Sequence, residues 1–241
     1  MVFYIKDSYM ENDDFLNQLT QYDVLLEESD TLEEINSISV NNINYLKKLG
    51  AKAVVVACNT ATSSISEEIK NSKGYIIGVI EPTANLAYDC SKNKRIGVFA
   101  TNLTIKTKAY DKYLKDAVVF GEGCSDFVLP IEEGQIHTDE MRNMIKNHVK
   151  VLDNVDTLIL GCTHFPYIKD EISKIIPNVV LVESGEATSK VLNSYLNDNK
   201  LTSNYENRSL IFLTTNNKQD AINQLSRLNQ KFDNIEEVRV D

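Results

Sequence analysis

Long apolar runs are missing from the 241-residue sequence. No stretch approaches the roughly 18 consecutive apolar residues that a membrane-spanning helix needs, so we expect no membrane partner. The first residues show no apolar segment followed by a cleavage-site pattern. Their composition therefore predicts a cytoplasmic protein without a secretory signal.

Cysteine and histidine are also scarce, with four and three residues respectively. The cysteines form no CxxC pair and have no other short spacing, which is neither a zinc pattern nor a disulfide framework. His137 and His148 have no partner at metal-ligand spacing, so we expect both to be solvated and expect no bound metal. Cys90 falls in a predicted helix and is expected in the core, whereas Cys124 lies in a Gly-rich loop and is expected to be a bystander.

Basic residues are outnumbered, since 25 Lys and Arg stand against 35 Asp and Glu, giving a net charge of −10. A phosphate backbone needs a basic face, so this balance argues against nucleic acid as a main partner. It does not exclude a small anionic ligand, because backbone N–H groups at a helix N-terminus bind carboxylates locally.

What the sequence does contain is one pattern that occurs twice. Residues 54–60 read Val-Val-Val-Ala-Cys-Asn-Thr, and residues 158–164 read Leu-Ile-Leu-Gly-Cys-Thr-His. An aliphatic run without alternation is typical of a parallel strand buried on both faces. The polar residues after it would lie where open α/β sheets bind ligands. Each copy is followed by a helical pattern and a second apolar run, which favours a duplicated architecture over two unrelated units.

Strand and helix patterns alternate along the chain, which predicts an α/β fold with mainly parallel sheets. We expect two similar domains related by a pseudo-twofold axis, with the active site in the cleft between them. The polar stretches around 93–95 and 197–207 suggest a first lobe of residues 1–93 plus 205–241 and a second lobe of residues 94–204. Strands are expected at 2–5, 22–26, 54–57, 75–80, 96–100, 117–120, 158–161, 179–182, 210–214 and 238–240. Helices are expected near 11–19, 32–49, 60–70, 101–114, 138–151 and 218–228, with a further helix that has Pro82 in its first turn and a helical pattern at 168–172. A loop is expected at 121–125.

The two matched cysteines, Cys58 and Cys162, suggest acid–base chemistry. A thiolate accepts a proton well, and a helix N-terminus favours the thiolate form. Two thiols facing each other across a cleft could remove a proton from one face of a carbon and return it to the opposite face. No cofactor is evident, so aimed N–H groups would have to stabilise the carbanion. The alternative for each cysteine is a small buried apolar residue at a strand end.

Two motifs resemble the signatures of cofactor-independent glutamate racemases, in the aspartate/glutamate racemase superfamily. They are Ala-Cys-Asn-Thr-Ala at 57–61 and Gly-Cys-Thr-His-Phe-Pro at 161–166. His164 is similar to the glutamate branch, since aspartate racemases tend to carry an acidic residue there. Further matches lie at 78–82, 100–104, 128–134, 184–188 and 212–215.

The resemblance implies a 1,1-proton transfer that interconverts L- and D-glutamate without a cofactor and supplies D-glutamate for peptidoglycan. It implies Cys58 and Cys162 as the two acid/bases, with Asp7 assisting Cys58, and His164 with Glu132 assisting Cys162. Glu133 is the rival of Glu132 for this role. A homodimer is an open alternative to a monomer. The residues implied in substrate binding are Ser8, Asn59, Thr60, Thr101, Thr104 and Thr163. For Thr101 and Thr104, an ordinary helix cap and first-turn residue is the alternative.

The first 45 or so residues depart from the family pattern. Tyr-Met-Glu-Asn at 9–12 follows Asp7 and Ser8 where the family has a Gly-rich turn, and Glu-Glu-Ser-Asp at 27–30 stands where it has a Pro-Tyr-Gly segment. Two alternatives therefore stay open. One is a related enzyme acting on another amino acid, such as aspartate, and the other is a non-catalytic binding protein on the same scaffold.

Overall fold

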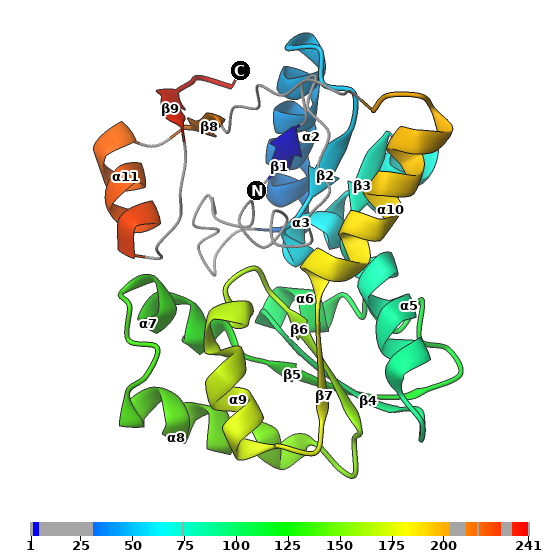
Figure 1. Cartoon of the computed structure of the whole chain (residues 1–241), viewed down its shortest axis with the longest axis vertical. Helices are drawn as coiled ribbons and strands as arrows, with labels where there is room; N and C mark the ends of the chain where they lie inside the picture. The colour runs from blue at the N-terminus through cyan, green and yellow to red at the C-terminus, as the bar shows by residue number, and fades with distance from the viewer. Residues whose placement is uncertain are drawn as a thin grey trace.

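The computed structural model describes residues 2–4, 31–73, 75–202, 211–215, 217–227 and 233–240. Figure 1 shows these residues arranged around a smaller sheet in the upper half and a larger sheet in the lower half. The strand expected at 22–26, the helix expected at 11–19, and both Asp7 and Ser8 lie outside the described residues.

The smaller sheet has the order β1-β2-β3, built from Val2–Tyr4, Val54–Val56 and Ile76–Gly78. Strand β2 pairs in parallel with β3 and antiparallel with β1. All three residues of β2 and of β3 are buried. This burial is why the valine run shows no alternation of apolar and polar residues.

One face of this sheet is covered by α2 (Leu32–Lys48) and α3 (Asn59–Ser64). Thr31 caps α2 in a capping box with Glu34, and Gly50 follows the helix at φ +86°, a conformation that glycine adopts without strain. The single helix expected at 60–70 is wrong. The chain breaks at Ile65 (φ −109°, ψ 30°), whose side chain is fully buried, and α4 (Ser66–Asn71) follows.

The larger sheet is wholly parallel, with the order β5-β4-β6-β7. Its strands are β4 (Arg95–Ala100), β5 (Val118–Gly123), β6 (Thr157–Gly161) and β7 (Val180–Glu183). The loop expected from residue 121 is wrong, because β5 continues to Gly123, which pairs with Ala100. A Cβ at Gly123 would lie 2.1 Å from the Asn102 side-chain oxygen, so glycine serves close packing here rather than a turn.

The helices of the lower half are short. They are α6 (Asn102–Lys106), α7 (Val128–Glu132), α8 (Asp139–His148) and α9 (Lys169–Ile175), with 3₁₀ turns at Ser125–Phe127, Val149–Val151 and Phe165–Ile168. The helix expected to run from 101 to 114 stops at Lys106. Lys108 then takes a left-handed conformation (φ +50°), which a continuing helix cannot accommodate.

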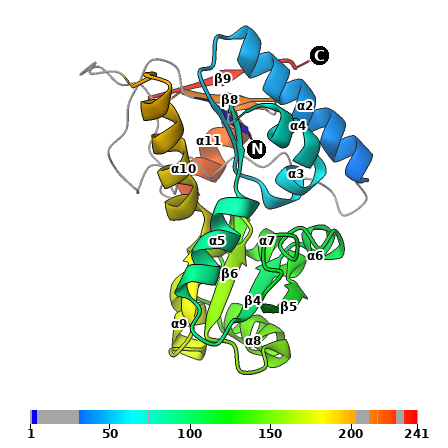
Figure 2. The same ribbon diagram turned by 90° about the vertical axis from the view of Figure 1, so that its right-hand side faces the viewer.

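Two longer helices exchange partners between the sheets. Helix α5 (Ile80–Cys90) follows β3 of the smaller sheet, but its buried residues Ile80, Ala84 and Ala87 pack against β4, β6 and β7. Helix α10 (Ser184–Asp198) follows β7 of the larger sheet, but Leu192 and Leu196 pack against β2 and β3. Figures 1 and 2 show α5 beside the lower sheet and α10 beside the upper one. The lobe boundaries given above stay a prediction.

The C-terminal part forms a separate parallel pair, β8 (Ile211–Thr214) and β9 (Asn234–Glu237), with α11 (Lys218–Arg227). Leu213 packs against the core beneath α2. The final strand expected at 238–240 is wrong, because the buried residue that pairs with Phe212 is Ile235. No helix among the described residues has the length and apolar character needed to cross a bilayer. The predicted α/β class with mainly parallel sheets is confirmed.

Candidate functional site

Cys58 lies at the junction of β2 and α3. It is the N-cap residue of α3, its sulfur lies 3.5 Å from the backbone nitrogen of Ala61, and only 8% of the residue is exposed. A sulfur in this position accepts a hydrogen bond from a backbone N–H group of the first helical turn. At many other helices the side-chain oxygen of a Ser or Thr does the same. The strand-to-helix turn predicted around this cysteine is therefore present.

Cys162 directly follows β6 and begins a chain of polar contacts. Its sulfur lies 3.7 Å from Nδ1 of His164, and Nε2 of His164 lies 3.1 Å from Oε1 of Glu132. The side chains of His164 and Glu132 are only 8% and 11% exposed. Because a carboxylate only accepts hydrogen bonds, Nε2 donates to Glu132, and in the neutral ring Nδ1 then presents a lone pair to the thiol.

The rival carboxylate, Glu133, lies apart from this chain. It is exposed and accepts a hydrogen bond from the side chain of Gln135 at 2.9 Å. Glu132 and Glu133 fall at the end of α7, where consecutive residues point in different directions, so a register of one residue decides which carboxylate reaches His164.

Three threonine hydroxyls converge between the two halves of the structure. The Thr60 hydroxyl lies 2.8 Å from that of Thr101 and 3.1 Å from that of Thr104, which are 2.9 Å from each other. Thr101 also accepts a hydrogen bond from the Thr104 backbone nitrogen as the N-cap of α6, so capping and clustering occur together. Hydroxyls both donate and accept, so this cluster can bind a carboxylate or an ammonium group.

A cavity of about 20 Å³ is lined by residues of both Cys motifs. Its lining includes Asn59, which follows Cys58, together with Cys162 and Thr163. It also includes the hydroxyls of Ser184 and Thr188, which are buried and have no hydrogen-bond partner among the described residues. Buried polar groups are normally satisfied, so this cavity favours a water molecule or a polar ligand atom.

One residue that contacts the lining of this cavity could not be identified from a sequence motif. Tyr110, which is 2% exposed, donates a hydrogen bond from its hydroxyl to Oδ1 of Asn59 at 2.7 Å. Burial raises the pKa of Tyr110 well above its usual range, so the hydroxyl keeps its proton. The contact joins residues 51 positions apart, and no local pattern could have predicted it.

The remaining cysteines and histidines have structural roles. Cys124 is fully buried, and burial raises the pKa of its thiol strongly, as expected for a bystander. Cys90 is half-buried and packs on the α5 side of the larger sheet. His137 is exposed and pairs with Glu171. The prediction that His148 is solvated is wrong, because its side chain is 16% exposed and contacts the carboxylates of Glu122 and Asp126.

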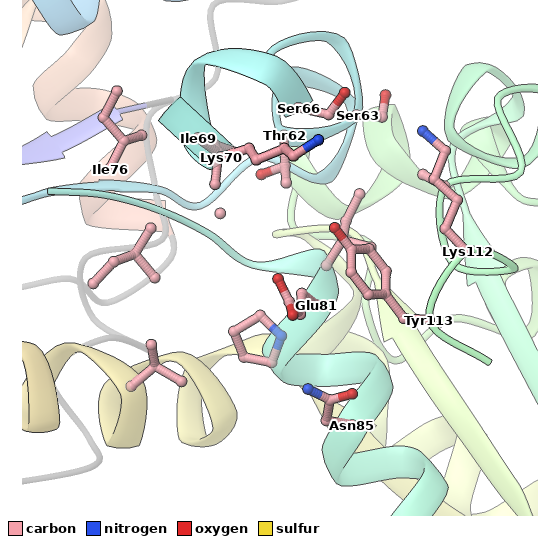
Figure 3. Close-up of a pocket in the computed structure, with 16 residues that line it drawn as sticks. Thr62, Ser63, Ser66, Ile69, Lys70, Ile76, Glu81, Asn85, Lys112 and Tyr113 are labelled. Atoms are coloured by element: carbon pink, nitrogen blue, oxygen red, sulfur yellow. The ribbon is translucent and has the colours of Figure 1, made fainter. Parts of the chain in front are cut away.

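A larger cavity of about 370 Å³ lies away from both cysteines. Figure 3 shows Glu81, Asn85 and Tyr113 on one side of it and Ser63, Ser66 and Lys70 on the other. No residue of either Cys motif lines this cavity, so its size alone does not identify it as the reaction site.

Comparison with known proteins agrees with this architecture. Residues 24–192 match the Asp/Glu/Hydantoin racemase family model. The chain is 40% identical over 168 residues to a glutamate racemase of Aquifex aeolicus, covering 68% of this chain and 66% of the relative. It is 38% identical over 188 residues to that of Persephonella marina, covering 76% and 71%. The match thus spans just under two thirds of the Aquifex aeolicus protein.

Solved structures give the same result. A glutamate racemase of Bacillus anthracis superposes with a TM-score of 0.84 at 27% identity, covering 90% of this chain and 85% of that one. A glutamate racemase of Francisella tularensis in complex with D-glutamate gives 0.80 at 27% identity, covering 92% and 86%. Fold and sequence together define the class, an α/β protein with the fold of these racemases. The chain belongs to the Asp/Glu/Hydantoin racemase family, and the relatives named above are glutamate racemases.

Proposed function

We propose that this protein is a cofactor-independent glutamate racemase that interconverts L- and D-glutamate by two-base proton transfer. The observation that carries the proposal is the cavity lined by both Cys motifs, through Asn59 on one side and through Cys162 and Thr163 on the other. Supply of D-glutamate for peptidoglycan and a cytoplasmic location come with the family resemblance and form part of the proposal. A homodimer stays an alternative to a monomer.

In the proposed reaction, one cysteine thiolate takes the α-proton from one face of the substrate. The electron pair of the broken C–H bond moves onto the α-carboxylate, where hydrogen-bond donors stabilise it. The thiol on the other face then gives its proton to the α-carbon, which inverts the stereocentre. The two cysteines end with their protonation states exchanged, so the reverse reaction uses the same groups in opposite roles.

The contacts of Cys162 fit this role. When Nδ1 of His164 accepts the thiol proton, the imidazolium is stabilised by the buried Glu132 carboxylate at 3.1 Å. Cys58 is the N-cap residue of α3, and its sulfur accepts a hydrogen bond from the Ala61 backbone nitrogen. Asp7 and Ser8, which the resemblance assigns to the Cys58 side and to the substrate amino group, lie outside the described residues. Asn59, Thr163 and the cluster of Thr60, Thr101 and Thr104 supply the donors and acceptors that the substrate needs.

The test is incubation with L-glutamate in D₂O, followed by chiral analysis and mass spectrometry. We expect racemised product that carries one deuterium at the α-carbon. Cys58→Ala and Cys162→Ala should each abolish racemisation, whereas Cys90→Ala, a matched control in helix α5, should retain it. Full racemisation by either active-site variant would overturn the mechanism.

A second candidate function is racemisation of another amino acid. It is favoured by the Glu-Glu-Ser-Asp sequence at 27–30, where the family has a Pro-Tyr-Gly segment. A panel of L- and D-amino acids decides between the two, and glutamate as the best substrate would reject the second. Absence of α-proton exchange with every amino acid would instead favour the binding-protein alternative.

A further inference from the structure

We propose that Tyr110 is a positioning residue that fixes the orientation of the Asn59 side-chain amide for binding the substrate α-carboxylate. The inference rests on the proposed function for its substrate but on the geometry of these two residues for its mechanism. Tyr110 touches no part of the proposed reaction itself and acts through Asn59.

The first step of the argument concerns the direction of the hydrogen bond. Tyr110 has a hydroxyl that can donate, and the carbonyl oxygen of an amide can only accept. The 2.7 Å contact between the Tyr110 hydroxyl and Oδ1 of Asn59 therefore occupies the oxygen side of the amide. The NH₂ side is left to face other groups, and Asn59 lines the cavity that contains Cys162 and Thr163.

The second step concerns what the amide would do without this bond. The two ends of an asparagine side chain have nearly the same shape, so packing alone does not select one orientation. With NH₂ toward the cavity, Asn59 donates to a carboxylate; turned by 180°, it would present an oxygen and repel one. With the amide turned over, the Tyr110 hydroxyl could accept from NH₂, but its own proton, which the buried residue keeps, would lose the acceptor that Oδ1 provides. The hydroxyl therefore favours the donating orientation.

The third step concerns why Tyr110 can hold this position. The residue is 2% exposed, and Asn59 is 3% exposed, so water does not compete for the hydrogen bond. The ring lies close to Gly161, where an added Cβ would be 3.2 Å from Cε2 of Tyr110. Tyr110 thereby bonds the residue after Cys58 and lies close to the residue before Cys162.

The direct test is a neutron crystal structure of Tyr110→Phe, which keeps the ring and removes the hydroxyl, because the deuterium atoms distinguish the amide nitrogen from the oxygen. We expect the Asn59 amide to turn over or to occupy two orientations. An Asn59 amide unchanged in orientation and equally well ordered would overturn the proposal, whether or not the protein racemises glutamate. This outcome is therefore distinct from failure of the proposed function, which the wild-type activity assay decides.

The kinetic test is a double-mutant cycle on glutamate racemisation. Tyr110→Phe should raise KM roughly 10- to 150-fold with a smaller change in kcat, as expected for loss of one oriented hydrogen bond to a charged group. In an Asn59→Ala background the same substitution should have no further effect, because the group it orients is gone. Equal losses in both backgrounds would show a merely structural role and refute the proposal.

A second variant covers the case in which Tyr110→Phe does not fold. Asn59→Asp keeps an acceptor for the Tyr110 hydroxyl but replaces the amide NH₂ with a second carboxylate oxygen. We expect calorimetry to show L-glutamate affinity at least as low as in Asn59→Ala. Wild-type affinity in Asn59→Asp would overturn the assignment of the NH₂ group as the carboxylate donor.

Discussion

Replacing Glu132 with glutamine removes the negative charge beside His164 and keeps the shape of the side chain. The neutral amide can still contact Nε2, but in the proposed mechanism it would no longer stabilise the imidazolium that forms when Cys162 loses its proton. Glu132→Gln should therefore slow the proton transfer at Cys162 while leaving the fold intact, which thermal unfolding checks.

The size of the effect follows from the burial of the pair. The contact is 3.1 Å long, and the two side chains are only 8% and 11% exposed, so solvent screens it weakly. A hydrogen bond to a charged group of this kind contributes about 1.5–3 kcal/mol. Lost from the transition state, that free energy corresponds to a roughly 10- to 150-fold fall in kcat/KM. Because L- and D-glutamate have equal free energies, kcat/KM must fall by the same factor in both directions.

The assay is circular dichroism of L- and D-glutamate solutions, followed separately from each enantiomer. Glu133→Gln is the matched control, since that carboxylate is exposed and bonds Gln135. Its kcat/KM should stay within about threefold of wild type, a change too small to assign to a transition-state contact. The reasoning is refuted if Glu132→Gln is equally mild, or if Glu133→Gln loses more activity than Glu132→Gln.

Three further predictions concern stability. Asp156→Asn should lower it by about 1 kcal/mol, or about 2–4 °C in Tm, after allowance for solvent screening. Burial alone would raise the pKa of Asp156, but four hydrogen bonds outweigh it and lower that pKa to about 2. This stabilisation is present at neutral pH and is lost as pH falls from about 4 toward 2, and exposed Asp153→Asn should change little. Burial opposes the charged form of His148, yet its two carboxylate partners raise its pKa above 6.5. The stabilisation that the charged His148 contributes is therefore complete below pH 6.5 and declines as pH rises through the raised pKa. His148→Gln should abolish this decline in urea unfolding between about pH 6 and pH 9. Gly161→Ala should cost about 1–3 kcal/mol of unfolding free energy, because its Cβ would lie 3.0 Å from a backbone oxygen.

Most of the framework could be predicted because the buried strands are continuous aliphatic runs. Strands β2 and β6 begin and end close to where the apolar runs do, and α2 begins after Thr31, a residue type that favours the N-cap position. Local sequence could not show that the helix after Cys58 breaks at Ile65. Nor could it show that glycines 121 and 123 belong to a strand, because both results depend on packing against distant residues.

The site follows the same division. The two cysteines could be found because a repeated motif marks them, and His164 is part of the second motif. The resemblance favoured Glu132 and left Glu133 as its rival, since only the register of α7 against His164 separates them. Tyr110 belongs to no motif, and its partner lies 51 positions away in the chain, beyond the reach of any local pattern.

The exchange of α5 and α10 between the sheets has a consequence for autonomy. A gene cut near codon 93 would yield one polypeptide that carries α5 away from the strands it shields, and another that carries α10 away from those it shields. Each fragment would expose the apolar face of its sheet and would also contain a helix whose apolar face has lost its partner. Neither fragment should be stable by itself, yet the two co-expressed should re-associate, so the two sheets of this protein depend on each other's helices for a complete core.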